Sequence, residues 1–249
     1  MTDLSGQAVL VTGASTGIGA ASARLLARAG ADVGVHYFRS ARAARGVAGA
    51  VEAAGRRALV LKADVRRPGQ VDRMVEQFVG AFGRIDTLVA NAGGLVRRSP
   101  VHEASDALWR EVFALNVESV FYTVRAALRH MLTLKRGNII INASVAARTG
   151  GGGGSVPYAA AKGALVSFTR GLALEVAARG IRVNAIAPGV TDTPFHEKYT
   201  ERARMKAFRK KLPLPKIGTP DDIARAVVWL AGEGEGFITG ETIWIAGGG

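Results

Sequence analysis

Short apolar runs alternate with helical patterns along the whole chain. The runs lie at residues 7–13, 31–37, 58–65, 86–93, 137–144, 181–189 and 241–248, and each is nearly uniformly apolar. Apolar residues at helical spacing predict helices over residues 17–30, 40–55, 68–83, about 109–132, from Pro157 onward and 220–231. Uniformly apolar strands that alternate with helices predict an α/β fold, a doubly wound parallel β-sheet with helices on both faces.

No linker or internal repeat interrupts this alternation, so we expect residues 1–249 to form a single domain. The 249 residues are 48% hydrophobic, which is enough for one large core. Residues 190–216 are the one irregular insertion, rich in charge and proline, between a strand and the last helix. Insertions at the carboxyl ends of strands are where doubly wound sheets bind their ligands.

The chain is strongly basic, with 33 lysines and arginines against 20 acidic residues and a formal net charge of +13. Such a charge favours phosphates, nucleic acid or an acidic protein partner, or is spread over solvated surface. Cysteine is absent, which excludes disulfides and thiol catalysis and is consistent with a reducing compartment. No charged leader opens the chain and no apolar run approaches the roughly 20 residues that span a bilayer, so we expect a cytoplasmic protein that does not bind membranes.

A glycine-rich turn, TGASTGIG at residues 12–19, lies between the first strand and the first helix. Gly13, Gly17 and Gly19 follow a GxxxGxG spacing and not the GxGxxG of the general dinucleotide fingerprint. Glycine allows a close approach of the backbone, and the free N–H groups of a helix start favour a pyrophosphate. The turn therefore indicates a nucleotide site, although a plain strand-to-helix turn has the same composition.

Eight motifs occur in the order that is typical of one enzyme family. They are TGASTGIG at 12–19, ADV at 63–65, NAG at 91–93, LNVESVF at 115–121, Ser144, YAAAK at 158–162, NAIAPG at 184–189 and ITGETIWIAGG near the end. By these motifs the whole chain resembles the short-chain dehydrogenase/reductases, and among them the 3-oxoacyl-acyl-carrier-protein reductases. The resemblance implies a three-layer Rossmann fold, a nicotinamide dinucleotide cofactor and a homotetramer.

The resemblance also implies which residues contact the dinucleotide. They are Gly13, Ser15, Thr16, Gly17, Ile18, Gly19, Tyr37, Arg39, Ser40, Asp64, Val65, Asn91, Ala92, Gly93, Tyr158, Lys162, Pro188, Gly189, Val190 and Thr193.

The end of the second strand indicates which nicotinamide cofactor is used. A carboxylate there binds the adenosine ribose of NAD and repels the extra phosphate of NADP. This chain has Tyr37 at that place, followed by Arg39 and Ser40, whereas Asp32 begins the strand and belongs at its far end. Because an arginine can fork onto a phosphate, we expect NADP(H) more than NAD(H), the alternative being that Arg39 is a solvated loop residue.

Tyr158 and Lys162 lie one helical turn apart, in a helix that we expect to begin with Ser155 as a side-chain cap and Pro157 in its first turn. A tyrosine has a pKa near 10, and lowering it to about 7 requires about 4 kcal/mol. An ammonium about 4 Å away supplies roughly that at an effective dielectric near 20. We therefore predict that Lys162 lowers the pKa of Tyr158, which donates its proton to a carbonyl oxygen or accepts it in the reverse direction.

Three further features surround this pair. Ser144 ends the fifth strand, so its hydroxyl can hold the substrate oxygen, with Ser155 as a competitor for that role. Asn116 resembles the family residue that holds a water linking the lysine to solvent. Five glycines, residues 150–154, span the gap between Ser144 and Tyr158 and leave room over the expected substrate cavity, but their freedom puts the order of this loop in doubt.

These features favour an NADP(H)-dependent carbonyl or alcohol oxidoreductase of the 3-oxoacyl thioester reductase type, with a sugar or polyol dehydrogenase as the alternative. Residues 190–216 match the family's substrate lid, and the cations of residues 196–216, with Arg97 and Arg98 nearby in sequence, suit an acidic carrier protein or a coenzyme A phosphate.

A nucleotide sensor or nucleic-acid-binding protein needs no proton donor, and no nucleic-acid-binding motif is visible. No catalytic metal is predicted, since the histidines His36, His102, His130 and His196 lack partners at ligand spacing.

Overall fold

A computed structural model describes residues 2–232 and 236–249. Seven parallel strands form one sheet in the order β3-β2-β1-β4-β5-β6-β7. Their bounds are β1 (Ala8–Val11), β2 (Asp32–Tyr37), β3 (Ala58–Lys62), β4 (Thr87–Ala90), β5 (Gly137–Asn142), β6 (Ile181–Pro188) and β7 (Thr242–Ile245). All seven predicted strands are therefore confirmed, and so is the doubly wound α/β fold.

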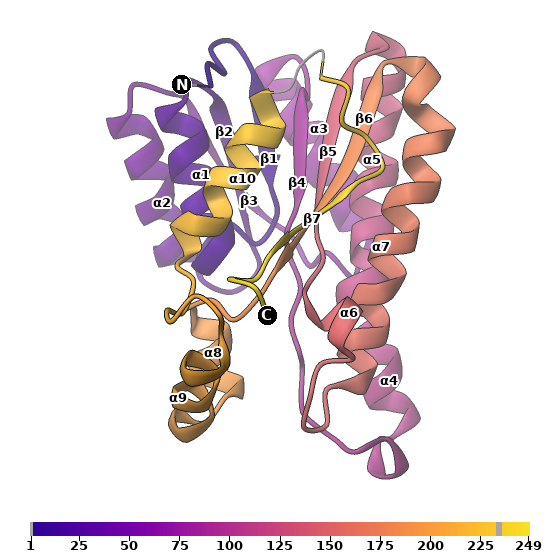
Figure 1. The fold of residues 1–249 in the computed structure, drawn as a ribbon. Helices are drawn as coiled ribbons and strands as arrows, with labels where there is room; N and C mark the ends of the chain where they lie inside the picture. Colours follow the sequence, from indigo (N-terminus) through magenta and orange to yellow (C-terminus); the bar gives the residue numbers. More distant parts are fainter. Residues whose placement is uncertain (1, 233–235) are drawn as a thin grey trace.

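Helices cover both faces of the sheet (Figure 1). On one face lie α1 (Gly17–Arg28), α2 (Ala41–Ala53) and α10 (Pro220–Gly232), and on the other lie α3 (Pro68–Phe82), α5 (Ser119–Leu134) and α7 (Val156–Val176). Each set buries its apolar stripe against the sheet and forms one of two core layers. Gly34 of β2 allows a close approach of α3, because a Cβ there would lie 2.6 Å from the ring of Phe78.

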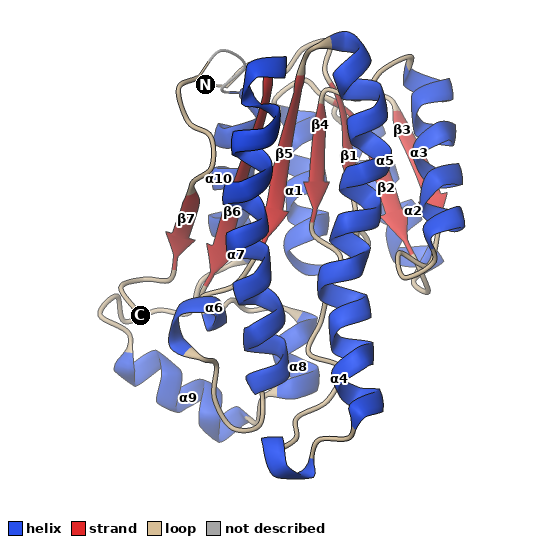
Figure 2. Cartoon of the chain, turned by 90° about the vertical axis from the view of Figure 1, so that its right-hand side faces the viewer, coloured by secondary structure: helices blue, strands red, loops and turns tan. Residues whose placement is uncertain are grey.

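The order of the strands places the ligand site. β1 pairs with β2 on one side and with β4 on the other, so successive connections from these strands leave the sheet toward opposite faces. In open α/β sheets the crevice at such a switch point, beyond the carboxyl ends of the strands, is where ligands bind. Figure 2 shows the shorter helices α6 (Ala146–Thr149), α8 (Pro194–Tyr199) and α9 (Arg202–Lys211) gathered below these strand ends.

Two segments differ in detail from the prediction. The helix expected over residues 109–132 is α4 (Asp106–Phe113), a π-helical turn η2 (Ala114–Glu118) and α5 in succession. Residues 190–216, expected to be irregular, contain α8, which has a proline in its first turn, and α9. Within the described ranges 2–232 and 236–249, no helix is both long and apolar enough to cross a bilayer.

Candidate active site

A cavity of about 590 Å³ lies beyond the carboxyl ends of β1 to β6 and is bounded by α8 and α9. Most of the residues predicted for the site line it. They are Gly13, Ser15, Thr16, Gly17, Ile18, Gly19, Tyr37, Arg39, Asp64, Val65, Asn91, Ala92, Gly93, Ser144, Tyr158, Lys162, Pro188, Gly189, Val190 and Thr193. Ser40 and Asn116 do not line it, because Ser40 precedes the first turn of α2 and Asn116 is fully buried behind the wall.

The backbone of the glycine turn leaves a concave space that side chains at its glycine positions would fill. Gly13 and Gly17 adopt positive φ values of 64° and 55°. A Cβ at Gly19 would clash with the carbonyl oxygen of Gly13 and lie 2.5 Å from Nδ2 of Asn91. The side chain of Thr16 makes no capping bond with the first N–H groups of α1, and the first three residues of that helix line the cavity. Backbone donors, open space and a helix start together fit the pyrophosphate of a dinucleotide.

Side chains from two other strands hold this turn in place. Nδ1 of His36 accepts a hydrogen bond from the Gly13 N–H at 2.9 Å, and its Nε2 donates to the Ala63 carbonyl at 3.1 Å. Burial lowers the pKa of His36, which keeps the ring neutral and able to accept. Nδ2 of Asn91 donates to the Thr12 carbonyl at 2.8 Å. The backbone shape of the turn therefore depends on β2 and on the end of β4.

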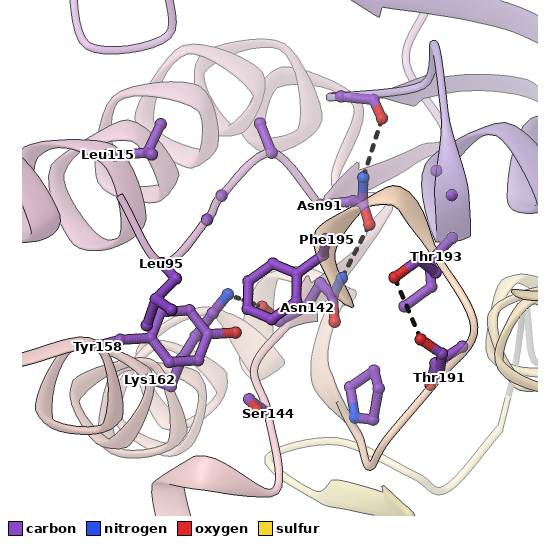
Figure 3. A pocket seen from close by; sticks show the side chains of 18 of the residues that line it. Asn91, Leu95, Leu115, Asn142, Ser144, Tyr158, Lys162, Thr191, Thr193 and Phe195 are labelled. Carbon is purple, nitrogen blue, oxygen red and sulfur yellow. Dashed lines mark hydrogen bonds between the residues drawn. The ribbon is translucent and has the colours of Figure 1, made fainter. Parts of the chain in front are cut away.

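Tyr158, Lys162 and Ser144 lie close together at the end of β5, with Phe195 of α8 across from the tyrosine (Figure 3). The Lys162 ammonium lies 5.8 Å from the centroid of the Tyr158 ring and donates to the carbonyl of Asn142 at 2.5 Å. The rings of Tyr158 and Phe195 are 5.9 Å apart. Two distant elements, α7 and the end of β5, thus bring together the three residues that the motifs predicted as catalytic.

The electrostatics of this cluster differ from the prediction that Lys162 lowers the pKa of Tyr158. Burial raises the pKa of Tyr158 to about 12, and a hydrogen bond with the Ser144 hydroxyl offsets part of this. Burial also lowers the pKa of Lys162 to about 7. The physical reason is desolvation, which disfavours the charged form of each group and outweighs their attraction. The prediction of an acidic tyrosine in this arrangement is therefore wrong.

Asn116 lies in the π-helical turn, and such widened turns are frequent at functional sites. Its Nδ2 donates to the carbonyls of Gly94 at 2.8 Å and Val112 at 2.9 Å, and its Oδ1 accepts from the Gly94 N–H at 3.0 Å. A Cβ on Gly93 would lie 2.8 Å from this Oδ1 and 3.4 Å from Nζ of Lys162. The hydrogen bonds of Asn116 therefore hold the segment after β4 beside Lys162. That Asn116 holds a water stays a prediction.

Comparison with known proteins supports one family. The family model described as Enoyl-(Acyl carrier protein) reductase matches residues 13–249. The chain is 38% identical to 3beta-hydroxysteroid dehydrogenase 1 of Eggerthella lenta, over 99% of this chain and 94% of the relative. It is 36% identical to the 3-oxoacyl-acyl-carrier-protein reductase of Chlamydia pneumoniae, over 98% of this chain and 97% of the relative.

Solved structures extend the same similarity to three dimensions. A short-chain dehydrogenase from Burkholderia cenocepacia J2315 in complex with NADP superposes with a TM-score of 0.91 at 37% identity, covering 98% of each chain. The chain belongs to the short-chain dehydrogenase/reductase family. A 7 alpha-hydroxysteroid dehydrogenase complexed with NADH superposes with a TM-score of 0.94 at 29% identity, covering 100% of this chain and 96% of the other.

This short-chain dehydrogenase/reductase is therefore an oxidoreductase that acts on CH–OH or carbonyl groups with a nicotinamide dinucleotide. The model match and the relatives span nearly the whole chain, so the similarity includes both the glycine turn and the Tyr158–Lys162 pair. The two solved complexes contain different nicotinamide cofactors. The choice between NAD and NADP therefore depends on this chain's own residues.

The end of the cavity that follows β2 and β3 is basic and aromatic. The guanidinium groups of Arg39 and Arg66 lie 5.1 Å and 5.8 Å from the centroid of the Phe38 ring. Arg66 also donates two hydrogen bonds to the Asp64 carboxylate, from Nη2 to Oδ2 at 2.8 Å and from Nε to Oδ1 at 2.9 Å. These bonds hold the pKa of that carboxyl below its ordinary value. Asp32 lies at the opposite end of β2, as expected, and is paired with Arg57 at 2.7 Å. No carboxylate follows β2 between Tyr37 and Ser40.

The glycine loop, residues 150–154, is tied down by hydrogen bonds. Ser155 occupies the position before α7, as predicted, but its hydroxyl makes no capping bond. It instead accepts from the N–H of Gly152 at 2.8 Å and donates to the carbonyl of the same residue at 2.9 Å. The cap prediction is therefore wrong, because the loop folds back over Ser155. Its hydroxyl is committed to the loop, which leaves Ser144 as the serine that bonds Tyr158.

Several residues of the site were not predicted from the sequence. Asn142 accepts from Lys162 with its carbonyl and donates from Nδ2 to Oδ1 of Asn91 at 2.8 Å, so it links the lysine to the glycine turn. Phe195 and His196 of α8 line the substrate end. The position of Asn142 two residues before Ser144 could have indicated its role, and Phe195 and His196 lie within residues 190–216, which were predicted as the substrate lid without these two being named as site residues. Within the part of the chain that the structure describes, no group of three or more potential metal ligands occurs.

Proposed function

We propose that this enzyme interconverts a carbonyl and a secondary alcohol with NADP(H) as its cofactor, and that 3-oxoacyl thioesters are its substrate class. The observation that carries the proposal is which side chains lie at the two ends of one cavity. One end presents Ser144, Tyr158 and Lys162, and the other presents Arg39 in a stretch, residues 37–40, that contains no acidic residue. An arginine at that place can fork onto the additional phosphate of NADP, whereas a carboxylate would be needed to select NAD.

The nicotinamide supplies or accepts a hydride when it is bound. The glycine turn and the start of α1 hold the pyrophosphate, and Arg39 holds the phosphate on the ribose. The Ser144 hydroxyl orients the substrate oxygen, and Tyr158 gives its proton to that oxygen as negative charge develops. Lys162, whose pKa burial lowers to about 7, loses and regains a proton near neutral pH and so suits the resupply of Tyr158.

A tyrosine with a raised pKa is still a competent donor in the direction of reduction. An alkoxide is about as basic as hydroxide, whose conjugate acid has a pKa of about 15.7. Transfer of the proton from Tyr158, whose pKa burial raises to about 12, is therefore downhill. In the direction of oxidation, Tyr158 must first lose its proton, which the same burial opposes. At neutral pH Tyr158 is therefore present in the protonated form that reduction requires.

A panel of substrates tests the reaction. Purified protein is mixed with NADPH or NADH and with β-keto thioesters, steroid ketones or sugar-derived ketones, and absorbance reports oxidation of the cofactor. We expect β-keto thioesters to give the highest kcat/KM. A sugar or polyol derivative giving the highest value would establish the alternative substrate class within the same family. No turnover of any ketone would refute the proposed reaction.

A single substitution tests the cofactor proposal. Arg39→Ala removes the guanidinium that we propose binds the ribose phosphate, and losing a charged hydrogen-bonding partner costs about 1.5 to 3 kcal/mol. The dissociation constant of NADPH, measured by fluorescence titration, should rise at least about tenfold, while that of NADH stays within twofold. Equal affinities of the parent protein for NADH and NADPH would contradict the preference.

The lid and the surface suggest further partners. Exposed cations on and after α9, among them Lys206, Arg209 and Lys210, suit an acidic carrier protein or a coenzyme A phosphate. We expect the KM of a carrier-linked substrate to rise steeply with salt, while that of a short uncharged thioester does not. We also propose a homotetramer, and a cytoplasmic location that the cysteine-free composition suits.

A further inference from the structure

Arg98 connects two segments that face each other across the substrate end of the cavity. It lies between β4 and the short 3-10 helix η1 (Val101–Glu103). Its Nε donates to the carbonyl of Tyr199, the last residue of α8, at 2.9 Å. Its Nη1 donates to the carbonyls of Gly152 at 2.6 Å and Gly153 at 3.0 Å. One guanidinium therefore bonds the lid helix and the glycine loop at the same time.

The neighbouring backbone strengthens the contact with the glycine loop. The N–H of Ser99 donates to the carbonyl of Gly154 at 2.8 Å. Gly154 has a φ of 74°, and a Cβ there would lie 2.9 Å from the Ser99 nitrogen, so only glycine allows this approach. Figure 2 shows the glycine loop before α7, helix α8 and the stretch that leads to α4 all below the strand ends, where the hydrogen bonds of Arg98 link them.

Both bonded segments contribute to the substrate end of the site. Gly151 and Gly152 line the cavity from the loop, and Phe195 and His196 line it from α8. The ring of Phe195 packs against that of Tyr158, the predicted proton donor. The glycine turn that fits the pyrophosphate is held by His36 and Asn91. A change at Arg98 should therefore alter the substrate end and leave the dinucleotide end intact.

We propose that Arg98 is a positioning residue that couples the lid helix α8 to the glycine loop and so sets the width of the substrate end of the cavity. The coupling needs arginine, because its donors are arranged in a rigid fork, whereas the compact ammonium of lysine cannot span the same carbonyls. The effect of this coupling on catalysis rests on the proposed function. The coupling itself is a property of the fold and can be tested without any substrate.

Hydrogen exchange tests the coupling in the whole protein. Arg98→Gln and Arg98→Lys are compared with the parent, and amide exchange is followed in peptides that cover residues 150–154 and 194–199. We expect exchange in both segments to become at least about tenfold faster in both variants. Acceleration in only one segment, or in neither, overturns the proposal, and so does full protection in Arg98→Lys, since a charge alone would then suffice.

Steady-state kinetics test the consequence for the reaction. With the best ketone of the panel, we expect the KM to rise about tenfold or more in Arg98→Gln, while the dissociation constant of NADPH stays within twofold. A merely structural role would reduce the amount of active enzyme, which lowers kcat and leaves KM unchanged, and that result overturns the proposal. If the parent turns over no ketone, the proposed function fails, and the exchange experiment still decides the coupling.

Arg182 provides the matched control. Its guanidinium also donates to backbone carbonyls, that of Leu230 at 3.1 Å and that of Ile238 at 3.5 Å, but it lies near the start of β6, at the opposite end of the sheet. Arg182→Gln should reduce the midpoint of thermal unfolding without changing the KM of the ketone. An equal rise of KM in this variant would show that any loss of stability widens the site and would overturn the proposal.

Discussion

At the scale of single residues, burial sets the proton chemistry of the site. Tyr158 and Lys162 are four positions apart on α7, yet each responds more to removal from water than to the other. The result is a neutral tyrosine beside a lysine that titrates near pH 7. A neutral phenol suits proton donation to a developing alkoxide, so the arrangement is matched to reduction of a carbonyl.

Removing the proton donor should abolish most of the activity. We expect Tyr158→Phe to lower kcat by about 10² to 10⁴, the range of general acid catalysis, with little change in the dissociation constant of the dinucleotide. Absorbance assays and fluorescence titration measure the two quantities. Tyr122→Phe is the control, because among the described hydrogen bonds the hydroxyl of Tyr122 in α5 donates only to the Glu118 carboxylate at the end of η2. Unchanged turnover in Tyr158→Phe would contradict the assigned role.

The buried lysine should make stability depend on pH. Lys162 has a pKa of about 7 in the folded protein against an ordinary value of 10.5, so between these values the unfolded chain binds the additional proton. The free energy of unfolding should therefore rise with pH across this window, by up to about 1.36 kcal/mol per pH unit, and this group should add no further pH dependence below about pH 7, where both states bind the proton.

Lys162→Met lacks this titration, and urea unfolding at pH 7, 8 and 9 measures the difference. We expect the stability of the parent to rise relative to that of the variant across this series. Lys62→Met serves as the control because Lys62 is exposed at the end of β3. Parallel stability curves for the parent and Lys162→Met would show that the lysine keeps its ordinary pKa.

At the scale of elements, the site depends on segments that lack regular structure. The π-helical turn η2 brings Asn116 to the segment after β4, and the glycine loop adopts positive φ at four of its five residues. Hydrogen bonds from Ser155, Ser99 and Arg98 hold this loop. Glycine is thus required there for the path of the backbone as well as for space.

Two glycines of this loop form a matched pair. Gly150 and Gly154 have φ values of 75° and 74°, but a Cβ meets nothing within 4 Å at Gly150 and meets the Ser99 backbone at Gly154. Both alanine variants should lose about 1 to 2 kcal/mol of stability through backbone strain. Only Gly154→Ala should also lower kcat/KM for the ketone, by about tenfold, because it displaces the segment that carries Arg98. Urea unfolding and kinetics measure both effects, and equal losses of activity would contradict the contact.

At the scale of the whole molecule, one sheet with two core layers supports a site made from six strand ends. Several large apolar side chains remain outside these layers. Trp109 of α4, Phe121 of α5 and Leu174 of α7 are 44%, 43% and 69% exposed. The three helices lie on the same side of the sheet, and large exposed apolar side chains there are consistent with the proposed association of four copies.

Sedimentation tests this association. For a chain of 26.0 kDa we expect the mass of a tetramer in the parent. Leu174→Glu places a charge on the proposed interface and should produce smaller species while the far-UV circular dichroism stays unchanged. Glu175→Gln, at the adjacent exposed position, should leave the mass unaltered. A monomeric parent at micromolar concentration would refute the tetramer.

The sequence by itself determined the features that neighbouring residues encode. Alternating apolar runs specified all seven strands, and the spacing of glycines after β1 specified the turn that fits a pyrophosphate. The position of Ser144 at a strand end and the spacing of Tyr158 and Lys162 predicted that they share one site. These signals are local, because strand and helix periodicity and turn formation depend on residues a few positions apart.

Only the tertiary structure decided what distant segments do to one another. Arg98 bonds carbonyls that lie 54, 55 and 101 positions away, and no local pattern indicates such partners. The signs of the pKa shifts at Tyr158 and Lys162 depend on how completely α7 is covered, which the crossovers of the sheet determine. Desolvation and long-range hydrogen bonds are properties of the packed chain. The pKa values of Tyr158 and Lys162 and the link that Arg98 makes between α8 and the glycine loop are therefore decided only by the complete fold.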